Sequence, residues 1–475
     1  MRTATALVLL VFVLSPLWAA EASSRSPQFP GVSIAVYDEN PSHIWNRLYA
    51  ALRVREDPQA NKYGEDSLDP MLWHETEHLL SQPSAGLALR TMDEFLRTHA
   101  EKLIQSPLKR AMLQHDLWAV FDWSVQQSSW RGRRSGYGTE KRELQIRLAE
   151  VLGRLALTKE QIKSLPDNYA QAVASGAFSA QYDLAHPEQP FLPQDLFDPR
   201  GPWMCITPSP ELMGVGGVAK LHVLNLSGRS VFLVFVRLPQ GRQATFDYLQ
   251  TLWNFPQPWV AGPEPVASDQ SLPNPDLPPF PAGTQVALVR QMMLFDKQGG
   301  LVLSPITESV QIRVYREIKT AGMHDFSAGR DGLARNSGQD FFEIRISRPL
   351  LFSGKQGGLR ATGRDEREFP TFQAMGNDPI DSVSGRVERI HSQPPIMQRC
   401  HDCHFGGGIT SFNSLDSLLK PARRQQKPKD VNYGPRYWSE SNALWWKENR
   451  YDWGLLNGYW NARTMGIVSS AKGKR

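Results

Sequence analysis

Residues 231–238, VFLVFVRL, and residues 285–295, QVALVRQMMLF, form two apolar runs in the middle of a chain of 475 residues. Their content of Val, Leu and Phe and the turn residues beside them are typical of buried strands. Further strands are predicted at 221–226, around Val310, Ile312 and Val314, and at 341–347 (FFEIRIS). Because Ser227-Gly228-Arg229 and Gly299-Gly300 predict short turns, we expect a mostly antiparallel sheet or sandwich.

The chain before this region has a helical period. From about residue 41 to 190, apolar residues recur at spacings of three and four, as at Ile44, Leu48 and Leu52. Ser42 is the expected N-cap of the first helix, and Thr158 with Gln161 has the form of a capping box. We expect five to seven helices in this region.

Other segments follow neither pattern. Residues 255–283 contain nine Pro, and because Pro cannot donate to a sheet ladder we expect a long loop. After about residue 355 the chain becomes rich in Gly and charge (SGKQGGLRATGRDERE), and it closes with an aromatic, helical run at 442–461.

These patterns predict a multidomain α+β protein with a signal peptide at 1–22. An N-terminal α-helical domain is expected at 23–195, and a central, mostly antiparallel β-rich domain with the Pro-rich loop 255–283 at 196–355. Residues 356–475 are expected to form a linker and a small C-terminal segment.

The composition excludes several classes of protein. Lys and Arg number 53 against 48 Asp and Glu, and a net charge of +5 on this length is too dilute for a dedicated nucleic-acid surface. The three Cys exclude a disulfide scaffold. Because two of them are three residues apart, their chemistry is the main question.

The first 22 residues have the organisation of a secretory signal peptide. Arg2 precedes an apolar run at 6–14, and Ala20-Glu21-Ala22 is a small-x-small cleavage site. No later stretch approaches about 20 unbroken apolar residues, so we expect no transmembrane segment in the mature chain. We therefore expect export, with the periplasm of a bacterium as the destination.

The most specific chemical signal is Cys400-His401-Asp402-Cys403-His404. Two thiols at this spacing can each add to a vinyl group of one haem, and the following His can bind the iron. In these residues the chain resembles the c-type cytochromes. The resemblance implies one covalent haem c, thioethers at Cys400 and Cys403, His404 as proximal iron ligand and a role in electron transfer. It extends to no other part of the chain.

Two other interpretations of this motif remain open. A structural zinc site would use Cys400, Cys403 and His404 and would require Cys205 or His391 as a fourth ligand. A thiol-disulfide redox pair is the other, although the motif lies between a Pro-Pro pair and three Gly rather than after a strand. Cys205 itself is expected to be a small buried hydrophobic residue.

The sequence also leaves undecided which residue occupies the second axial position of the iron. A downstream Met is the usual second ligand in compact c-type cytochromes, which suggests Met465. His391 and His324 are alternatives, and an empty position would permit ligand or peroxide chemistry. Six aromatic residues either cover the haem or form the packed face of the last helix: Phe405, Trp445, Trp446, Trp453, Tyr459 and Trp460.

A second pattern, His74-Glu75-Thr76-Glu77-His78, satisfies H-E-x-x-H. On a helix the two His would share one face and bind zinc, with Glu75 as general base and Glu101 as a third ligand. A surface helix with charged residues on its exposed side is the simpler interpretation.

The sequence therefore predicts an exported, single-haem electron-transfer protein in which the small C-terminal segment within 356–475 is the haem-bearing one. The alternatives are an exported haem-dependent oxidoreductase with a peroxidase-like site and a zinc-stabilised binding module. The sequence identifies no catalytic residue, no redox partner protein and no small-molecule substrate.

Overall fold

The computed structural model describes most of the chain from residue 32 onward. The described residues are 32–57, 60–73, 76–126, 138–206, 219, 222–223, 228–261, 271–318, 338–366, 378, 380, 395–404, 408–411 and 444–464. The predicted signal peptide lies outside them, and the predicted division of the chain into domains stays a prediction.

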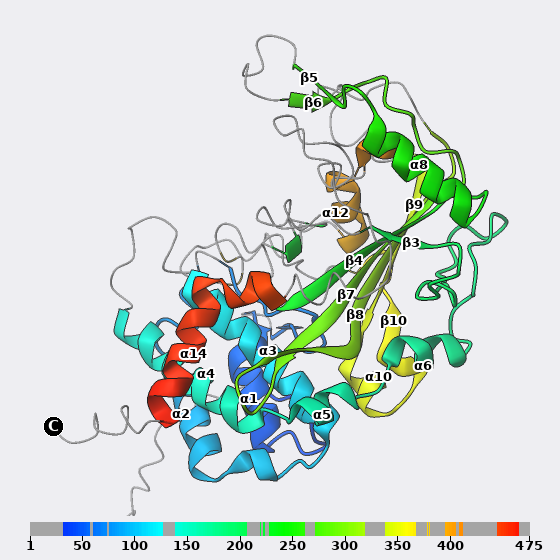
Figure 1. The fold of residues 1–475 in the computed structure, drawn as a ribbon. Coiled ribbons are helices and arrows are strands. Elements are labelled where there is room, and N and C mark those ends of the chain that lie inside the picture. Colours follow the sequence, from blue (N-terminus) through cyan, green and yellow to red (C-terminus); the bar gives the residue numbers. More distant parts are fainter. Residues whose placement is uncertain are drawn as a thin grey trace, which may run out of the picture. The chain divides into compact units, whose positions relative to one another are not determined.

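Six α-helices precede the first long strand in the described part of the chain (Figure 1). They are α1 (Ile44–Arg53), α2 (Ser84–Arg97), α3 (Pro107–Gln126), α4 (Gly138–Leu155), α5 (Lys159–Lys163) and α6 (Asn168–Ala174). A 3-10 turn, η1 (Ala100–Lys102), and two short paired strands, β1 (Arg55–Glu56) and β2 (Lys62–Tyr63), lie among them. The expectation of five to seven helices is confirmed.

Local capping explains where these helices begin. Thr158 accepts a hydrogen bond from the Gln161 backbone at 3.2 Å, and the Gln161 side chain accepts one from the Thr158 backbone at 3.0 Å. This is the predicted capping box. The predicted N-cap Ser42 is wrong by one residue, because the His43 ring accepts the Trp45 backbone N–H at 3.3 Å.

One six-stranded antiparallel sheet follows, in the order β10-β9-β8-β7-β4-β3. Its strands are β3 (Met204–Ile206), β4 (Ser230–Arg237), β7 (Gln285–Phe295), β8 (Leu301–Tyr315), β9 (Gln339–Ile346) and β10 (Leu359–Ala361). β4, β7, β8 and β9 coincide with predicted strands. A mixed α+β fold with an antiparallel sheet is thus confirmed.

Two predictions about the connections are wrong. His222 and Val223 were expected in a strand but lie in a helical turn, in which the Val223 N–H donates to the Ala219 carbonyl at 3.0 Å. The Pro-rich segment was expected to be a loop but contains β5 (Trp259–Ala261) paired with β6 (Ser271–Pro273). These strands form a separate ribbon, which needs fewer backbone donors than a central position in the main sheet. α8 (Arg242–Asn254) precedes the ribbon.

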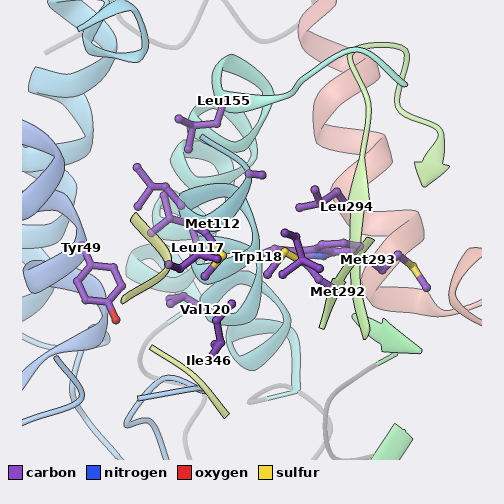
Figure 2. Close-up of a cluster of buried hydrophobic side chains, with 14 of the residues drawn as sticks. Tyr49, Met112, Leu117, Trp118, Val120, Leu155, Met292, Met293, Leu294 and Ile346 are labelled. Carbon is purple, nitrogen blue, oxygen red and sulfur yellow. The ribbon is translucent and has the colours of Figure 1, made fainter. Parts of the chain in front are cut away.

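The N-terminal helices pack on one face of the sheet and share one core with it. Trp118 of α3 meets Phe295 of β7 edge-on, with ring centroids 5.4 Å apart. Figure 2 shows the α3 side chains Met112, Leu117 and Trp118 in one cluster with the β7 side chains Met292, Met293 and Leu294. The C-terminal helix α14 (Tyr451–Thr464) joins this core through Trp453, whose ring lies 5.8 Å from Trp118.

The opposite face of the sheet carries a smaller apolar group, here called the second cluster. Because residues two apart on a strand share a face, Phe232, Val234 and Val236 point away from the helices. The buried members are Met204, Ile206, Ala219, Phe232, Val234, Val236, Leu238, Leu249, Leu252, Leu277, Phe280, Val286, Tyr315 and Ile409.

The remaining described elements connect these parts. They are α10 (Arg348–Phe352), η5 (Gln356–Gly358), α12 (Ile396–Cys403) and η8 (Gly408–Ser411). α12 carries the cysteine motif and packs against β9.

Candidate functional site

The cysteine motif forms the last turn of α12. The His404 N–H donates to the Cys400 carbonyl at 3.0 Å, which continues the helix to the end of the motif. Three residues turn about 300° around a helix axis, so backbone positions 400 and 403 of α12 lie only about 60° apart around that axis. At the start of α12 the Ile396 N–H donates to the Glu366 carbonyl at 2.9 Å. The backbone thus presents both cysteines on one side of the helix.

His404 is held against the sheet face that points away from the N-terminal helices. Arg313 of β8 reaches its Nδ1 through Nη1 at 3.2 Å, and Gln339 of β9 donates to its carbonyl at 3.4 Å. Arg313 pairs with Phe341 across the ladder, and the next pair on that face joins Tyr315 to Gln339. Cys400 and His404 are both half-buried there.

The chain that leaves the motif returns to the second cluster. Ile409 of η8 is only 3% exposed and is a buried member of the second cluster. Gly408 precedes it with φ +52°, and a Cβ there would lie 3.3 Å from the Ile318 side chain. The chain therefore joins the second cluster five residues beyond His404.

His222, which the sequence analysis did not single out, also lies beside the second cluster. The His222 ring packs on Phe232 of the second cluster, with centroids 5.6 Å apart and planes inclined by 48°. Burial, reinforced by the positive charges of Arg313 and Arg290, lowers the pKa of His222 to about 3. The imidazole is therefore neutral at pH 7. Its segment, LHVLNL, reads as a strand, so no sequence signal set it apart.

The contact between Arg313 and His404 constrains the histidine tautomer. A guanidinium only donates, so Nδ1 accepts and the ring proton resides on Nε2. A His that binds iron through Nε2 carries its proton on Nδ1 instead. Arg313 must therefore turn away from Nδ1 when His404 binds a metal. A guanidinium can bind a carboxylate, such as a haem propionate.

The donor set fits a covalently held haem. Cys400 and Cys403 are on adjacent positions of one helical face, His404 follows at the helix end, and the second cluster offers apolar cover. Among the described side chains, no three or more His, Cys, Asp or Glu converge in a way that would hold a metal ion. The Cys403 side chain lies outside that set, so this observation does not bear on the zinc alternative.

A buried histidine-carboxylate pair lies on the other side of the sheet. His115 Nε2 is 2.8 Å from Glu308, which also accepts from Ser230 at 2.6 Å and lies 3.3 Å from Arg290. Burial alone would raise the pKa of Glu308, but Arg290 and His115 outweigh it and lower the pKa to about 2. His115 is 3% and Glu308 1% exposed, so no substrate reaches them.

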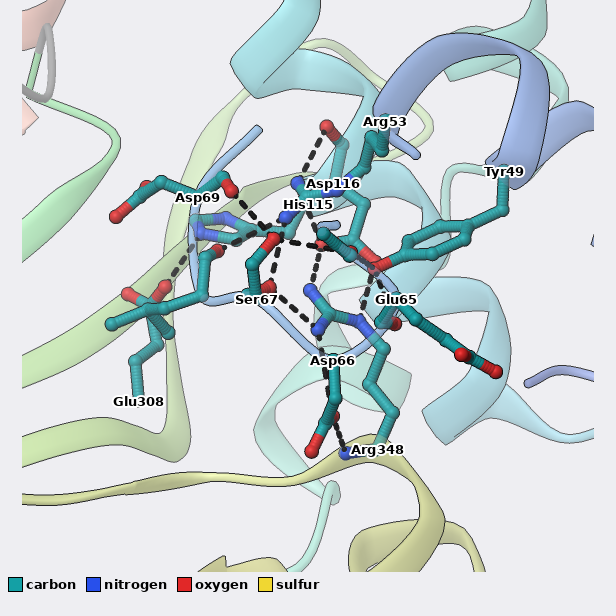
Figure 3. Close-up of polar contacts among 12 residues, drawn as sticks. Tyr49, Arg53, Glu65, Asp66, Ser67, Asp69, His115, Asp116, Glu308 and Arg348 are labelled. Atoms are coloured by element: carbon teal, nitrogen blue, oxygen red, sulfur yellow. Dashed lines mark hydrogen bonds and ion pairs between the residues drawn. The ribbon is translucent and has the colours of Figure 1, made fainter. Parts of the chain in front are cut away.

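A neighbouring group of ions ties the N-terminal helices to α10, which lies between β9 and β10 in the chain (Figure 3). Asp116 accepts from Arg348 at 2.9 Å and from the Tyr37 hydroxyl at 2.8 Å, and it lies 3.0 Å from Arg53. The two guanidinium groups overcome the effect of burial and keep the pKa of Asp116 below its usual value. Asp69 similarly holds Arg290 through two hydrogen bonds, at 2.8 and 2.9 Å. Each of the two carboxylates is thus paired with a guanidinium group, and the residues have the character of a structural network.

The structure places most of the six aromatic residues that were predicted either to cover the haem or to form the packed face of the last helix. Trp453, Tyr459 and Trp460 pack in the main core, with Trp460 5.6 Å from Phe295, so they form the packed face of α14. Trp445 is 54% exposed and Trp446 stacks under Arg450. Phe405 lies outside the described residues.

The other predicted iron ligands, Met465, His391 and His324, also lie outside the described residues, so the structure neither joins them to His404 nor separates them from it.

The H-E-x-x-H pattern does not have its expected helical form. Thr76, Glu77 and His78 lie in a loop and turn, whereas His74 and Glu75 fall outside the described residues. The Thr76 hydroxyl accepts the His78 N–H at 3.0 Å, a local bond that competes with helix formation. Both the zinc-helix and the surface-helix interpretations are therefore wrong at 76–78. Glu101 lies buried in η1 beside His99.

Cys205 is the buried hydrophobic residue that the sequence predicted. It is 1% exposed in β3, and burial raises the pKa of its thiol to about 12.

Comparison with protein-family models, with curated proteins and with solved structures finds no match. None of the helices in the described ranges is both long enough and apolar enough to cross a membrane.

Proposed function

We propose that this protein is exported to the periplasm, carries one haem c and transfers single electrons. Cys400 and Cys403 would provide the thioethers and His404 the proximal iron ligand. The observation that carries the proposal is the placement of the complete C-x-x-C-H motif on one helical turn. An exported chain is the context in which such a haem is attached, and the predicted signal peptide at 1–22 agrees with it.

The surrounding residues have definite tasks in this proposal. α12 orients the thiols, and the Gln339 side chain fixes the His404 backbone. The second cluster, which Ile409 joins five residues beyond His404, would supply apolar surface beside the haem. Arg313 provides a cation that can bind a propionate once His404 changes tautomer. When bound, haem c supplies a one-electron Fe(III)/Fe(II) couple.

The proposal is tested by expressing the full chain in a bacterial host that has c-type maturation machinery. Haem-stained denaturing gels are then compared for the wild-type protein, the Cys400→Ala, Cys403→Ala double variant and Cys205→Ala. We expect a stained band of the wild-type protein and of Cys205→Ala, and no stain in the double variant. The Cys205 variant is the matched control because it removes a buried thiol that lies outside the motif.

A colourless wild-type protein would contradict the proposal. Stoichiometric zinc in that protein, lost in the double variant, would instead support the zinc-stabilised binding module.

A further inference from the structure

The last described segment of the chain, residues 444–464, lies on the N-terminal helices and is here called the strap. Its helix α14 packs against α3 and α4 (Figure 1). Two glycines outside the strap make room for its aromatic rings. A Cβ at Gly228 would lie 2.5 Å from the Trp446 ring, and a Cβ at Gly153 of α4 would lie 2.5 Å from the Trp460 ring. The strap therefore rests on a surface whose shape fits it closely.

A buried lysine fastens the strap to α3. The Lys447 side chain is 0% exposed, and its Nζ lies 2.9 Å from Asp122 Oδ2 of α3 and 3.2 Å from Asp452 Oδ1 of α14. The same Nζ lies 5.0 Å from the centre of the Trp118 ring. An ammonium group that has lost its water needs anionic partners. Closure of the strap therefore depends on these two carboxylates.

Asp122 has the weakest hydrogen bonding in this cluster. Its Oδ2 accepts from Lys447 and lies 3.6 Å from Arg229 Nη1. Its Oδ1 is buried and has no hydrogen-bond partner among the residues that the structure describes. Both cations are shared with other carboxylates, since Lys447 also binds Asp452. Arg229 likewise donates to Asp69 at 3.2 Å. A buried carboxyl group in such surroundings favours its neutral form.

The pKa of Asp122 is accordingly raised to about 6 in the closed strap. Burial is the largest cause, Lys447 and Arg229 oppose it, and Asp452 reinforces it. Arg450, which lies 2.9 Å from Asp452, is the other charged group beside the cluster. Lifting the strap would remove Lys447 and Asp452 and admit water to Asp122, whose pKa would return toward the ordinary 3.8. Closure is therefore coupled to the uptake of a proton.

We propose that the strap is a pH-responsive fastening of the fold, which closes more tightly when Asp122 is protonated and loosens when Asp122 is charged. Because the pKa is raised in the closed state, this contribution to closure is complete below the ordinary pKa and is lost as the pH rises through 6. With these two pKa values, the equilibrium constant for closure is about tenfold larger at pH 5 than at pH 7. The inference does not rest on the proposed haem, since none of these residues belongs to the cysteine motif.

Hydrogen exchange of the full-length mature protein, followed by mass spectrometry of its peptides, measures the opening of the strap. Exchange rates of peptides from 444–464 are recorded between pH 5 and pH 8 and divided by the intrinsic rate at each pH. Peptides from β7 report the opening of the sheet. The proteins compared are the wild type, Asp122→Asn, Lys447→Met and the control Glu188→Gln, which changes a side chain that is 53% exposed.

We expect the strap to exchange faster than β7, and its protection in the wild type and in Glu188→Gln to be about tenfold larger at pH 5 than at pH 7. Asp122→Asn lacks the titrating group, so its strap should be protected equally at both pH values. Lys447→Met removes a cation that opposes the effect of burial. The midpoint of its pH dependence should therefore lie above pH 6.

A wild-type strap whose protection is the same at pH 5 and pH 7, or increases with pH, would overturn the proposal. The same pH dependence in Asp122→Asn would also overturn it, and so would a strap that opens only together with β7. If Asp122→Asn fails to fold, Lys447→Met decides, because an unchanged midpoint in that variant contradicts the role given to Asp122.

Discussion

The replacement Glu308→Gln tests the buried network of polar contacts that joins α3 to strands β4, β7 and β8. Glu308 is the extra residue of a bulge in β8, where Arg290 pairs with Ser309 but Gln291 pairs with Thr307. The bulge brings its carboxylate to His115, Ser230 and Arg290. Gln keeps the size and one hydrogen-bond acceptor but removes the charge.

The expected loss of stability follows from the pKa of Glu308. Its shift from the usual 4.5 to about 2 corresponds to about 3 kcal/mol, at roughly 1.4 kcal/mol per pKa unit. Removal of one partner from a buried ion pair costs about 3–5 kcal/mol, which agrees. Because the folded pKa is lowered, this stabilisation is complete above about pH 4.5 and is lost as the pH falls toward 2.

Denaturant unfolding, followed by circular dichroism, measures the free energy of unfolding of wild-type protein and Glu308→Gln between pH 7 and pH 3. We expect a difference of about 3 kcal/mol at pH 7 that falls to roughly 1 kcal/mol near pH 3. Glu188→Gln, which changes a side chain that is 53% exposed, should match the wild type throughout. A difference below about 1 kcal/mol at pH 7, or one that does not depend on pH, would refute the reasoning.

Two further predictions concern single buried groups. Tyr37→Phe removes the hydroxyl that donates to Asp116 at 2.8 Å and should lower the free energy of unfolding by about 1.5–3 kcal/mol; an unchanged denaturation midpoint would speak against this bond. Cys205 should resist alkylation in the folded protein because its pKa is raised to about 12, and it should react after unfolding. Mass spectrometry of the labelled peptides checks this, and rapid labelling of Cys205 in the native protein would contradict the burial.

The strands of the sheet were largely predictable from sequence because they combine apolar content with turn residues. β7 coincides with the predicted run 285–295, and β4 differs from its prediction by one residue at each end. The capping box at Thr158 was equally legible because its two hydrogen bonds are local in sequence.

The sequence-based predictions were wrong or incomplete where tertiary contacts determine the conformation. His222 and Val223 have strand-forming neighbours, yet they turn to place Val223 on the second cluster. The bulge at Glu308 and its partners from α3, β4 and β7 depend on contacts between distant segments. The aromatic run near the C-terminus left two interpretations open, and only the folded chain shows that Trp453 and Trp460 pack in the main core.

The candidate site shows the same division. Cys400, Cys403 and His404 were identified because the motif is contiguous. Arg313 was not, since the strand register and packing bring it to His404. Arg313 is an ordinary strand residue in its own segment, and only the folded chain brings it beside His404.

The pyridine haemochrome spectrum of the mature, exported protein tests the central claim most directly. The account predicts the spectrum of a haem attached through two thioethers, with one haem per chain that stays with the protein after denaturation and extraction. A protein without colour, or one whose haem is removed by extraction, would contradict covalent attachment at Cys400 and Cys403.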